Sequence, residues 1–173
     1  MKRVGHNGCS IPLKGMAVGK HHLSFDIGGE FFREYENSEV IEAELSVELD
    51  VAKSSTLMNI DGVITGNVGV ECDRCLEEVL LPIEAEFGLI VKFAKDIDEE
   101  RDEIIVIDPS EGELDLSQLF YDTVILSLPI QRVHDEGRCD PEMVKKLESL
   151  KGDNREKAEE SESPFSVLKN LKN

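Results

Sequence analysis

The most compact chemical motif in this 173-residue sequence is Cys72-Asp73-Arg74-Cys75, in which two residues separate two thiols. Two thiolates at this spacing can bind one tetrahedral zinc ion from a turn between strands. They can also form a redox-active dithiol, which needs one thiol of lowered pKa, usually at a helix N-terminus within a βαβ unit. Strand-like sequence flanks the motif on both sides, and this context disfavours the redox interpretation.

A zinc site needs two more ligands, and the sequence offers them far along the chain. His134 and Cys139 are spaced H-x4-C, but 58 residues separate Cys75 from His134, well beyond the ~15–20 of a compact zinc finger. The fold would have to bring the two pairs together. We predict a zinc site formed by Cys72, Cys75, His134 and Cys139; the alternative is that Cys72 points into the core and the other three fill turns.

Motifs typical of enzymes are missing from the sequence. It contains no Gly-rich phosphate loop, no G-x-S-x-G and no H-E-x-x-H motif. Glutamates at alternate strand positions usually form a solvated face rather than an acid/base pair, and His21-His22 is typical of a strand edge or surface. We therefore predict a protein that is not an enzyme.

Alternating apolar and polar residues predict the strands that must position these residues. Three long strands in succession, joined by short turns, indicate a meander. Glycines inside the second of them suggest that it is bent or bulged. The expected strands are Ile11–Val18, His21–Ile27, Ile41–Val51, Met58–Cys72 and Val79–Phe93, with a helical turn at Gly29–Tyr35 and a short apolar run at Ile104–Ile107.

Helical spacing takes over after Pro109. Asp115 and Gln118 resemble a capping box that begins a helix over Leu116–Leu128, and a second helix begins after Asp140 as N-cap. We predict an α+β fold, in which an antiparallel, twisted sheet that can curl into a barrel-like form carries helices at its C-terminal end. Residues 1–150 form the single domain, 151–163 a mobile charged linker and 164–173 a short docking segment.

The charge is strongly negative and unevenly placed. Nineteen Lys and Arg residues stand against 37 Asp and Glu residues, which gives a net charge of −18. Met1–His22 is +4, whereas Gly29–Asp50 is −7 and Glu71–Ser117 is −12. Because nucleic-acid affinity depends on cations that replace counterions, we expect only weak direct RNA contact, mainly through residues 1–22. No apolar run approaches the ~20 residues of a membrane span, so we expect a cytoplasmic protein without membrane contact.

A family resemblance joins these features. VECDRCLEEVLLPIEAEF (Val70–Phe87), DLSQLFYDTVILSLPIQRVH (Asp115–His134) and the following Cys139 resemble the YceD-like large-subunit ribosomal RNA accumulation proteins of bacteria, most closely the Bacteroidetes variant. Many members carry a second cysteine pair where this chain has His134 and Cys139. A family metal site therefore carries over directly only for Cys72 and Cys75. The C-terminal Ser163–Ser166 also departs from the family's Asp-Pro-Arg-Trp-like ending.

The resemblance implies a cytoplasmic, non-enzymatic factor in the accumulation or maturation of large-subunit ribosomal RNA. Its partner would be an assembling large-subunit particle or a basic ribosomal protein. A second hypothesis is a zinc-stapled interaction module whose acidic faces hold basic client proteins, because opposite charges speed encounter. A dithiol oxidoreductase is the third.

Overall fold

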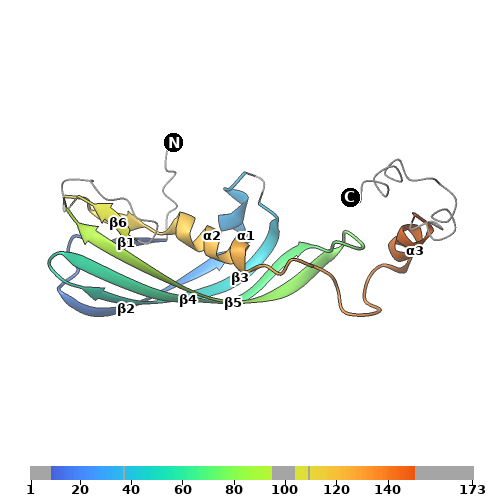
Figure 1. The fold of residues 1–173 in the computed structure, drawn as a ribbon, viewed down its shortest axis with the longest axis horizontal. Helices are drawn as coiled ribbons and strands as arrows, with labels where there is room; N and C mark the ends of the chain where they lie inside the picture. The colour runs from blue at the N-terminus through green and yellow to red at the C-terminus, as the bar shows by residue number, and fades with distance from the viewer. Residues whose placement is uncertain (1–8, 37, 95–103, 109, 151–173) are drawn as a thin grey trace, which may run out of the picture.

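The computed structural model describes residues 9–36, 38–94, 104–108 and 110–150, and its main feature is a curved five-stranded sheet. The sheet has the strand order β2-β3-β4-β5-β6 (Figure 1). Its strands are β2 (Gly19–Gly28), β3 (Val40–Lys53), β4 (Leu57–Glu71), β5 (Glu78–Phe93) and β6 (Ile104–Ile107).

The sheet is a meander that stays open. Neighbouring strands from β2 to β5 pair antiparallel, which confirms the predicted α+β class and the three long strands. Two details differ from the expectation. The strand β6 pairs parallel to β5, and β2 and β6 are the two edges of the sheet in the described part of the chain, so no barrel closes.

A second, two-stranded sheet lies near the N-terminus of the described chain. It pairs β1 (Ser10–Pro12) antiparallel with β7 (Glu113–Asp115). The predicted strand over Ile11–Val18 is therefore wrong in length, and it lies in a sheet of its own with β7. Leu13 N and Lys14 N both donate to Gly112 O, and Gly15 has φ of +100°, so the backbone turns away after three residues.

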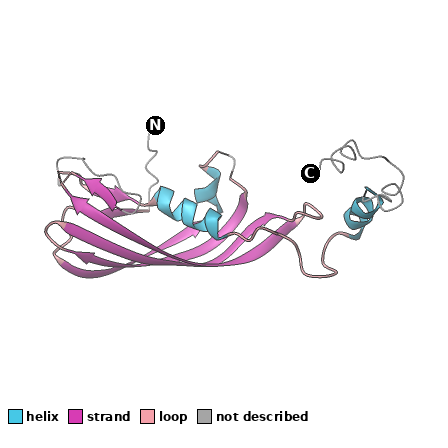
Figure 2. Cartoon of the chain, viewed as in Figure 1, coloured by secondary structure: helices cyan, strands magenta, loops and turns pink. Residues whose placement is uncertain are grey.

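The helices α1 (Gly29–Arg33) and α2 (Ser117–Ser127) lie on the concave side of the curved sheet (Figure 2). The ring of Phe120 in α2 is fully buried, with its centroid 5.8 Å from that of Phe25 in β2 and 5.7 Å from that of Phe87 in β5. Aromatic pairs at these distances add to the free energy of burial. The core thus lies between α2 and the inner face of the sheet.

Both predicted long helices are present, but the predicted capping box is wrong. Asp115 Oδ1 accepts hydrogen bonds from Ser117 N (2.9 Å) and Ser117 Oγ (2.6 Å), while Gln118 Nε2 donates to Asp122 Oδ1 instead. In α3 (Pro141–Leu150) the prediction holds, because Asp140 Oδ1 accepts from Glu142 N at 3.0 Å.

The alternation of the long strands sets which side chains face the core. In β3, Leu45, Val47 and Leu49 are buried, as predicted. The pattern breaks at the start of this strand, where the register shifts between Val40 and Glu42. Because a bulge adds a residue, Val40 is buried and Ile41 is 40% exposed, contrary to its predicted place on the inner face.

One glycine in β4 is required by the close approach of the neighbouring strand. Gly66 has φ of +143°, and a Cβ atom there would overlap the carbonyl oxygen of Glu44. Only glycine adopts this conformation readily. Gly66 thus lets β3 approach closely at this point, and the register of β4 runs through it without a shift.

The predicted linker at 151–163 and docking segment at 164–173 lie outside the described residues, as do Lys2 and Arg3 of the basic N-terminal stretch. None of the helices in the described ranges is long and apolar enough to cross a membrane.

A candidate metal centre

The turn between β4 and β5 holds the first two thiols. Cys72 N donates to Glu77 O and Leu76 N donates to Cys72 O, both at 2.9 Å, which closes a tight backbone loop. Leu76 has φ of +63°, in the left-handed region that a leucine adopts only at a cost. The loop turns both thiols inward, so that Cys72 and Cys75 are 0% and 3% exposed.

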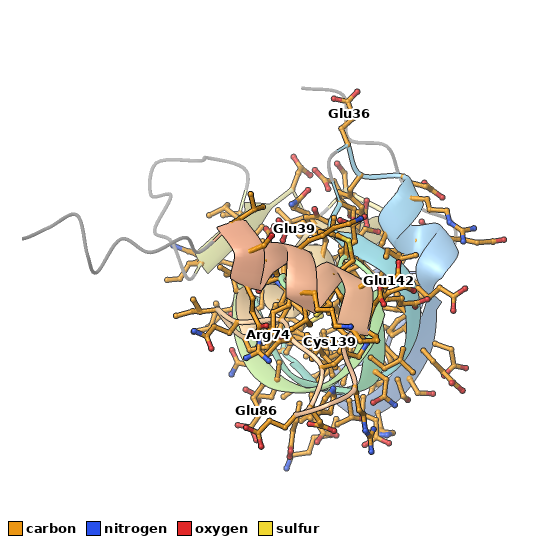
Figure 3. The ribbon with its side chains drawn as sticks, turned by 90° about the vertical axis from the view of Figure 1, so that its right-hand side faces the viewer. Glu36, Glu39, Arg74, Glu86, Cys139 and Glu142 are labelled. Carbon is orange, nitrogen blue, oxygen red and sulfur yellow. The ribbon has the colours of Figure 1, made fainter. Side chains whose placement is uncertain are left out.

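The segment that follows α2 runs beside this turn. Asp73 N donates to Arg132 O and Arg132 N donates to Asp73 Oδ2, both at 2.8 Å. Arg132 Nη1 also lies 2.6 Å from Glu39 Oε2 in an ion pair. Figure 3 views the molecule from this end, where Arg74 and Cys139 are labelled near one another. These contacts place residues distant in sequence beside the cysteine turn.

The four predicted ligands come together. The ligand atoms of Cys72, Cys75, His134 and Cys139 all lie within 4.8 Å of one another. Cys72 Sγ is 3.9 Å from Cys139 Sγ, and His134 Nδ1 is 3.4 Å from Cys75 Sγ and 3.9 Å from Cys139 Sγ. A zinc–sulfur distance of about 2.3 Å implies tetrahedral edges of about 3.8 Å. These three separations therefore match the size of a zinc coordination shell.

The imidazole of His134 is oriented by a backbone carbonyl. His134 Nε2 lies 3.0 Å from Glu78 O. A carbonyl can only accept, so this contact requires a proton on Nε2 and leaves the lone pair of Nδ1 facing the thiols. Such a hydrogen bond fixes the tautomer of histidine ligands in metal sites. His134 is thus presented to the cluster as a ligand would be.

The electrostatic environment favours the thiolate of Cys72. Burial alone would raise the pKa of this thiol. Hydrogen bonds from the backbone amides of Arg74, Cys75 and His134 outweigh burial and lower the pKa from 9.0 to about 6. The strand context had argued against a lowered thiol pKa here, and that inference was wrong. The amide N–H groups of this tight turn stabilise the thiolate, as those of a helix N-terminus do in other proteins.

Two of the other three ligands, His134 and Cys139, respond to that thiolate. The hydrogen bond with Cys72, reinforced by Glu78 O, raises the pKa of His134 above 6.5. Burial raises the pKa of Cys139 above 9.0, and the negative charge of Cys72 adds to it. The thiolate of Cys72 thus opposes ionisation of the neighbouring Cys139 thiol. A bound divalent cation would offset this repulsion between negative charges.

The geometry also separates this cluster from a catalytic dithiol. A reactive cysteine of low pKa must be accessible to its substrate. The side chain of Cys72 is fully buried, and it faces Cys139 across the cluster. Its low pKa therefore favours ligand chemistry over thiol exchange.

The fourth cysteine, Cys9, and the His21-His22 pair lie elsewhere. Cys9 is buried beside the start of α2, where its carbonyl accepts from Leu116 N at 2.9 Å. In β2, His21 Nε2 contacts Ala17 O, and His22 Nδ1 lies 3.1 Å from Asp50 Oδ1. Neither the isolated thiol nor the histidine pair belongs to the four-residue group.

Sequence reasoning missed the residues that hold the ligands in place. The carbonyl of Glu78 and the backbone of Arg132 act through main-chain atoms, which leave no trace in residue type. Asp73 and Leu76 lie inside or beside the predicted motif, and their short spacing to the thiols was the available signal.

Comparison with known proteins gives an independent view of the same residues. The sequence profile of the family described as "Large ribosomal RNA subunit accumulation protein YceD" matches residues 60–172. This chain belongs to the YceD family. A curated relative, "Large ribosomal RNA subunit accumulation protein YceD" of Haemophilus influenzae, is 32% identical over 120 residues.

That alignment covers 67% of this chain and 66% of the relative. No solved structure matches the chain. The YceD match begins within β4 and includes all four residues of the cluster, together with α2 and α3. The strands β2 and β3 precede it.

Proposed function

We propose that this chain is a non-enzymatic factor in the accumulation of large-subunit ribosomal RNA and that it acts by binding in the cytoplasm. Membership of the YceD family is the observation that carries the proposal. The fold supports a binding role, because it presents an acidic sheet face that can attract a basic partner. Its other conspicuous feature is the cluster of buried thiols at one end.

Deletion of the gene tests this function. Large-subunit ribosomal RNA should fall relative to small-subunit ribosomal RNA, and a plasmid copy of the full chain should restore the ratio. An unchanged ratio in the deletion strain, during rapid growth and during cold recovery, would refute the proposal.

Zinc at Cys72, Cys75, His134 and Cys139 is the cofactor proposed for this fold. The donor set of three thiols and one imidazole suits zinc, and the separations and the Glu78 carbonyl support it. All four positions are taken by side chains, as in structural sites, so zinc would stabilise the junction between the hairpin and the segment after α2.

Elemental analysis of protein purified without added metal and without a metal-affinity tag should find close to one zinc per chain. The Cys9→Ser variant is the matched control and should retain the metal. Metal-free protein whose cluster thiols all titrate rapidly in the native state would contradict the zinc assignment.

For partners, we propose an assembling large-subunit particle or a basic ribosomal protein, with direct RNA contact at most weak. The net charge of −18 opposes binding to a phosphate backbone. Sedimentation of tagged protein from cell extract tests this directly. If an intact particle is the partner, the protein should sediment with large-subunit precursors and leave these fractions after RNase treatment. If a free basic protein is the partner, the protein should sediment as a small complex that RNase does not change.

A further inference from the structure

The convex face of the sheet carries a concentration of carboxylates that nothing in the site explains. In Figure 1 the helices α1 and α2 lie above the sheet, and no described element covers the lower side of β2 to β5. We call this side the outer face. Its exposed acidic side chains include Asp26, Glu44, Glu48, Asp50, Asp61, Glu84 and Glu86.

These carboxylates are poorly compensated within the described residues. Asp50 has one ion pair, with His22, and no other member of the set has an ion pair in that part of the chain. The lysines of this face, Lys20 on β2 and Lys92 on β5, both lie at the same end of the sheet, as the register shows. The middle of the outer face is therefore left negative.

The register also brings two negative charges together on this face. Asp50 of β3 lies directly opposite Asp61 of β4. Like charges at directly opposed positions of antiparallel strands destabilise the pairing. A polypeptide that brings positive charge to this point would remove that cost. The repulsion between Asp50 and Asp61 therefore favours binding of a cationic partner here.

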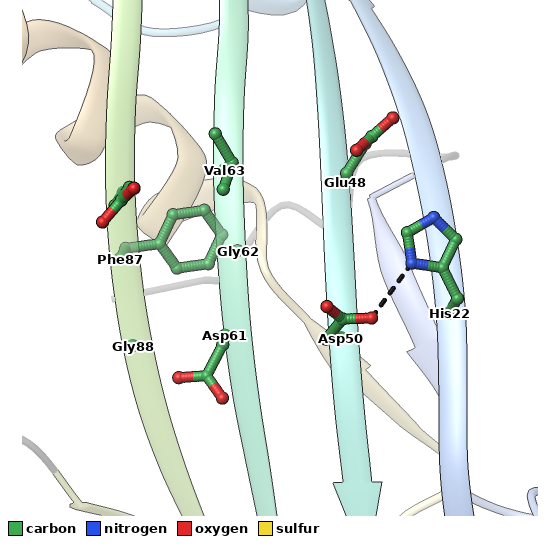
Figure 4. A pocket seen from close by; sticks show the side chains of 9 residues that line it. His22, Glu48, Asp50, Asp61, Gly62, Val63, Phe87 and Gly88 are labelled. Atoms are coloured by element: carbon green, nitrogen blue, oxygen red, sulfur yellow. Dashed lines mark hydrogen bonds and ion pairs between the residues drawn. The ribbon is translucent and has the colours of Figure 1, made fainter.

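A hollow of about 440 Å³ marks the same point. Its lining includes His22, Glu48, Asp50, Asp61 and Glu86 (Figure 4). Gly88, opposite Asp61, leaves it open because it has no side chain. A lysine or arginine side chain entering here would meet carboxylates from three strands.

The spacing selects an extended segment rather than a single ion. Neighbouring strands are about 4.8 Å apart, so the carboxylates are spread over the face, and they form no metal-binding group among the described residues. Glu48 and Asp50, like Glu84 and Glu86, are two residues apart on one strand. An extended chain presents alternate side chains at the same interval of about 6.8 Å.

We propose that the outer face binds an extended, Lys/Arg-rich segment of a protein partner, with one cationic side chain seated in the hollow beside Asp61. This proposal rests on the proposed function, whose partner it makes specific. The segment lies over the face and aligns alternate Lys or Arg residues with the carboxylate rows of β3 and β5.

Fluorescence anisotropy with the full chain tests the surface. The probe is a labelled 12-residue peptide with Lys or Arg at alternate positions and Thr between them, at near-physiological salt. The outer-face variant combines Asp50→Asn, Asp61→Asn and Glu86→Gln. The control variant, Glu111→Gln with Glu142→Gln and Glu148→Gln, removes the same charge from exposed positions elsewhere.

The outer-face variant should bind the peptide at least 10-fold more weakly, and the control should differ from wild type by less than 2-fold. Equal losses in the two variants would mean attraction by net charge alone and would overturn the proposal. Unchanged binding in both, or a large-subunit RNA fragment that displaces the peptide and binds the wild type more tightly, would also overturn it. Thermal melts of both variants guard against unfolding, and the Asp61→Asn change should raise the melting temperature.

The two proposals can fail separately. The deletion strain carrying the outer-face variant should show the low large-subunit RNA ratio of the empty strain, while the control variant restores it. If deletion leaves the ratio unchanged but the peptide result holds, the function fails and the surface stands. If deletion lowers the ratio and the outer-face variant restores it fully, the surface fails and the function stands.

Discussion

Cys72 and Cys9 are both buried thiols, yet their surroundings drive their chemistry in opposite directions. Amide donors of the β4–β5 turn and of His134 lower the pKa of Cys72 to about 6. Burial raises the pKa of Cys9 above 9.0, the charge of Asp115 adds to this, and a hydrogen bond with Ser117 offsets part of it. Exposure does not distinguish the two sites, since Cys9 is 7% and Cys72 0% exposed.

The difference lies in what the backbone does around each sulfur. At Cys9, the carbonyl is occupied by Leu116 N, and the thiol acts as a small apolar side chain of the core. At Cys72, a tight turn aims several N–H groups at one sulfur and places three further ligand side chains around it. Thiolate stabilisation, rather than burial, separates a candidate ligand from a core residue.

Loss of a ligand should have the largest effect. Cys72→Ser should reduce zinc from one per chain to a small fraction and destabilise the protein by about 4 kcal/mol, since loss of a bound metal belongs to the most damaging class of substitutions. For a chain of this size that is roughly 8–16 °C in melting temperature. Elemental analysis and thermal melts measure both quantities.

Cys9→Ser is the control for Cys72→Ser, because it changes a buried thiol that is not a proposed ligand. It should keep the zinc and lose stability only through the buried hydroxyl, by about 1–3 kcal/mol. If Cys72→Ser keeps its stability, or if Cys9→Ser loses the metal, then the two thiols have been assigned the wrong roles.

Metal removal should also divide the thiols by reactivity. With zinc bound, alkylation at pH 7 should be slow at every cluster cysteine. A chelator should speed reaction at Cys139, the most exposed of the four thiols, by 10-fold or more and leave Cys9 unchanged. Mass spectrometry of the alkylated peptides gives each rate. Equal rates at Cys139 before and after chelation would count against a bound metal.

The strands and helices could be predicted because their signals are local. Alternation in Ile41–Val51, Met58–Cys72 and Val79–Phe93 predicted β3, β4 and β5, which are 14, 15 and 16 residues long, and Asp140 with Pro141 predicted the start of α3. The sheet formed by β1 and β7 could not be predicted in the same way. Each strand has three residues, too few to show a period, and their pairing joins Ser10 to Asp115 across the whole fold.

The four residues of the candidate site were found from their chemistry, but their proximity was not determined by spacing. It depends on a long β4–β5 hairpin and on the chain after α2 running beside it, where Asp73 N donates to Arg132 O and Arg132 N donates to the side chain of Asp73. Hairpin length, helix direction and loop path must all be known before the two pairs can be seen to meet.

The pH dependence of stability should differ between the two thiols in metal-free protein. For Cys72 the folded pKa of about 6 lies below the unfolded value of 9.0, so the unfolded state binds more protons between these values. Stability from this thiol is therefore fully present above pH 9 and is lost as the pH falls through 6. For Cys9 the raised pKa gives stability that is present below pH 9 and lost above it.

Urea unfolding between pH 6 and 8.5 measures this difference. His134 opposes the trend of Cys72, because its raised pKa stabilises the folded state at low pH and that contribution fades as the pH rises. Because Cys72 itself raises the pKa of His134, the comparison is made in a His134→Gln background, where the stability difference between Cys72 and Cys72→Ala should grow with pH. Cys9→Ala should parallel wild type over this range, and a parallel Cys72→Ala curve would show that the thiolate of Cys72 adds no stability.

The smallest expected effects come from the two loops that carry the cluster, where two residues share a left-handed backbone but differ in side chain. Leu76 has φ of +63° and Gly137 has φ of +80°. Leu76→Gly should stabilise the zinc-bound protein by about 0.5–1 kcal/mol, because relief of the left-handed strain exceeds the added entropy of the unfolded chain. Gly137→Ala should destabilise it by about 1 kcal/mol, since a Cβ there meets no neighbour and only the backbone conformation resists it. Chemical denaturation resolves changes of this size, and zinc content should stay at one per chain in both variants. A destabilising Leu76→Gly or a stabilising Gly137→Ala would mean that left-handed backbone strain does not set the stability at that position.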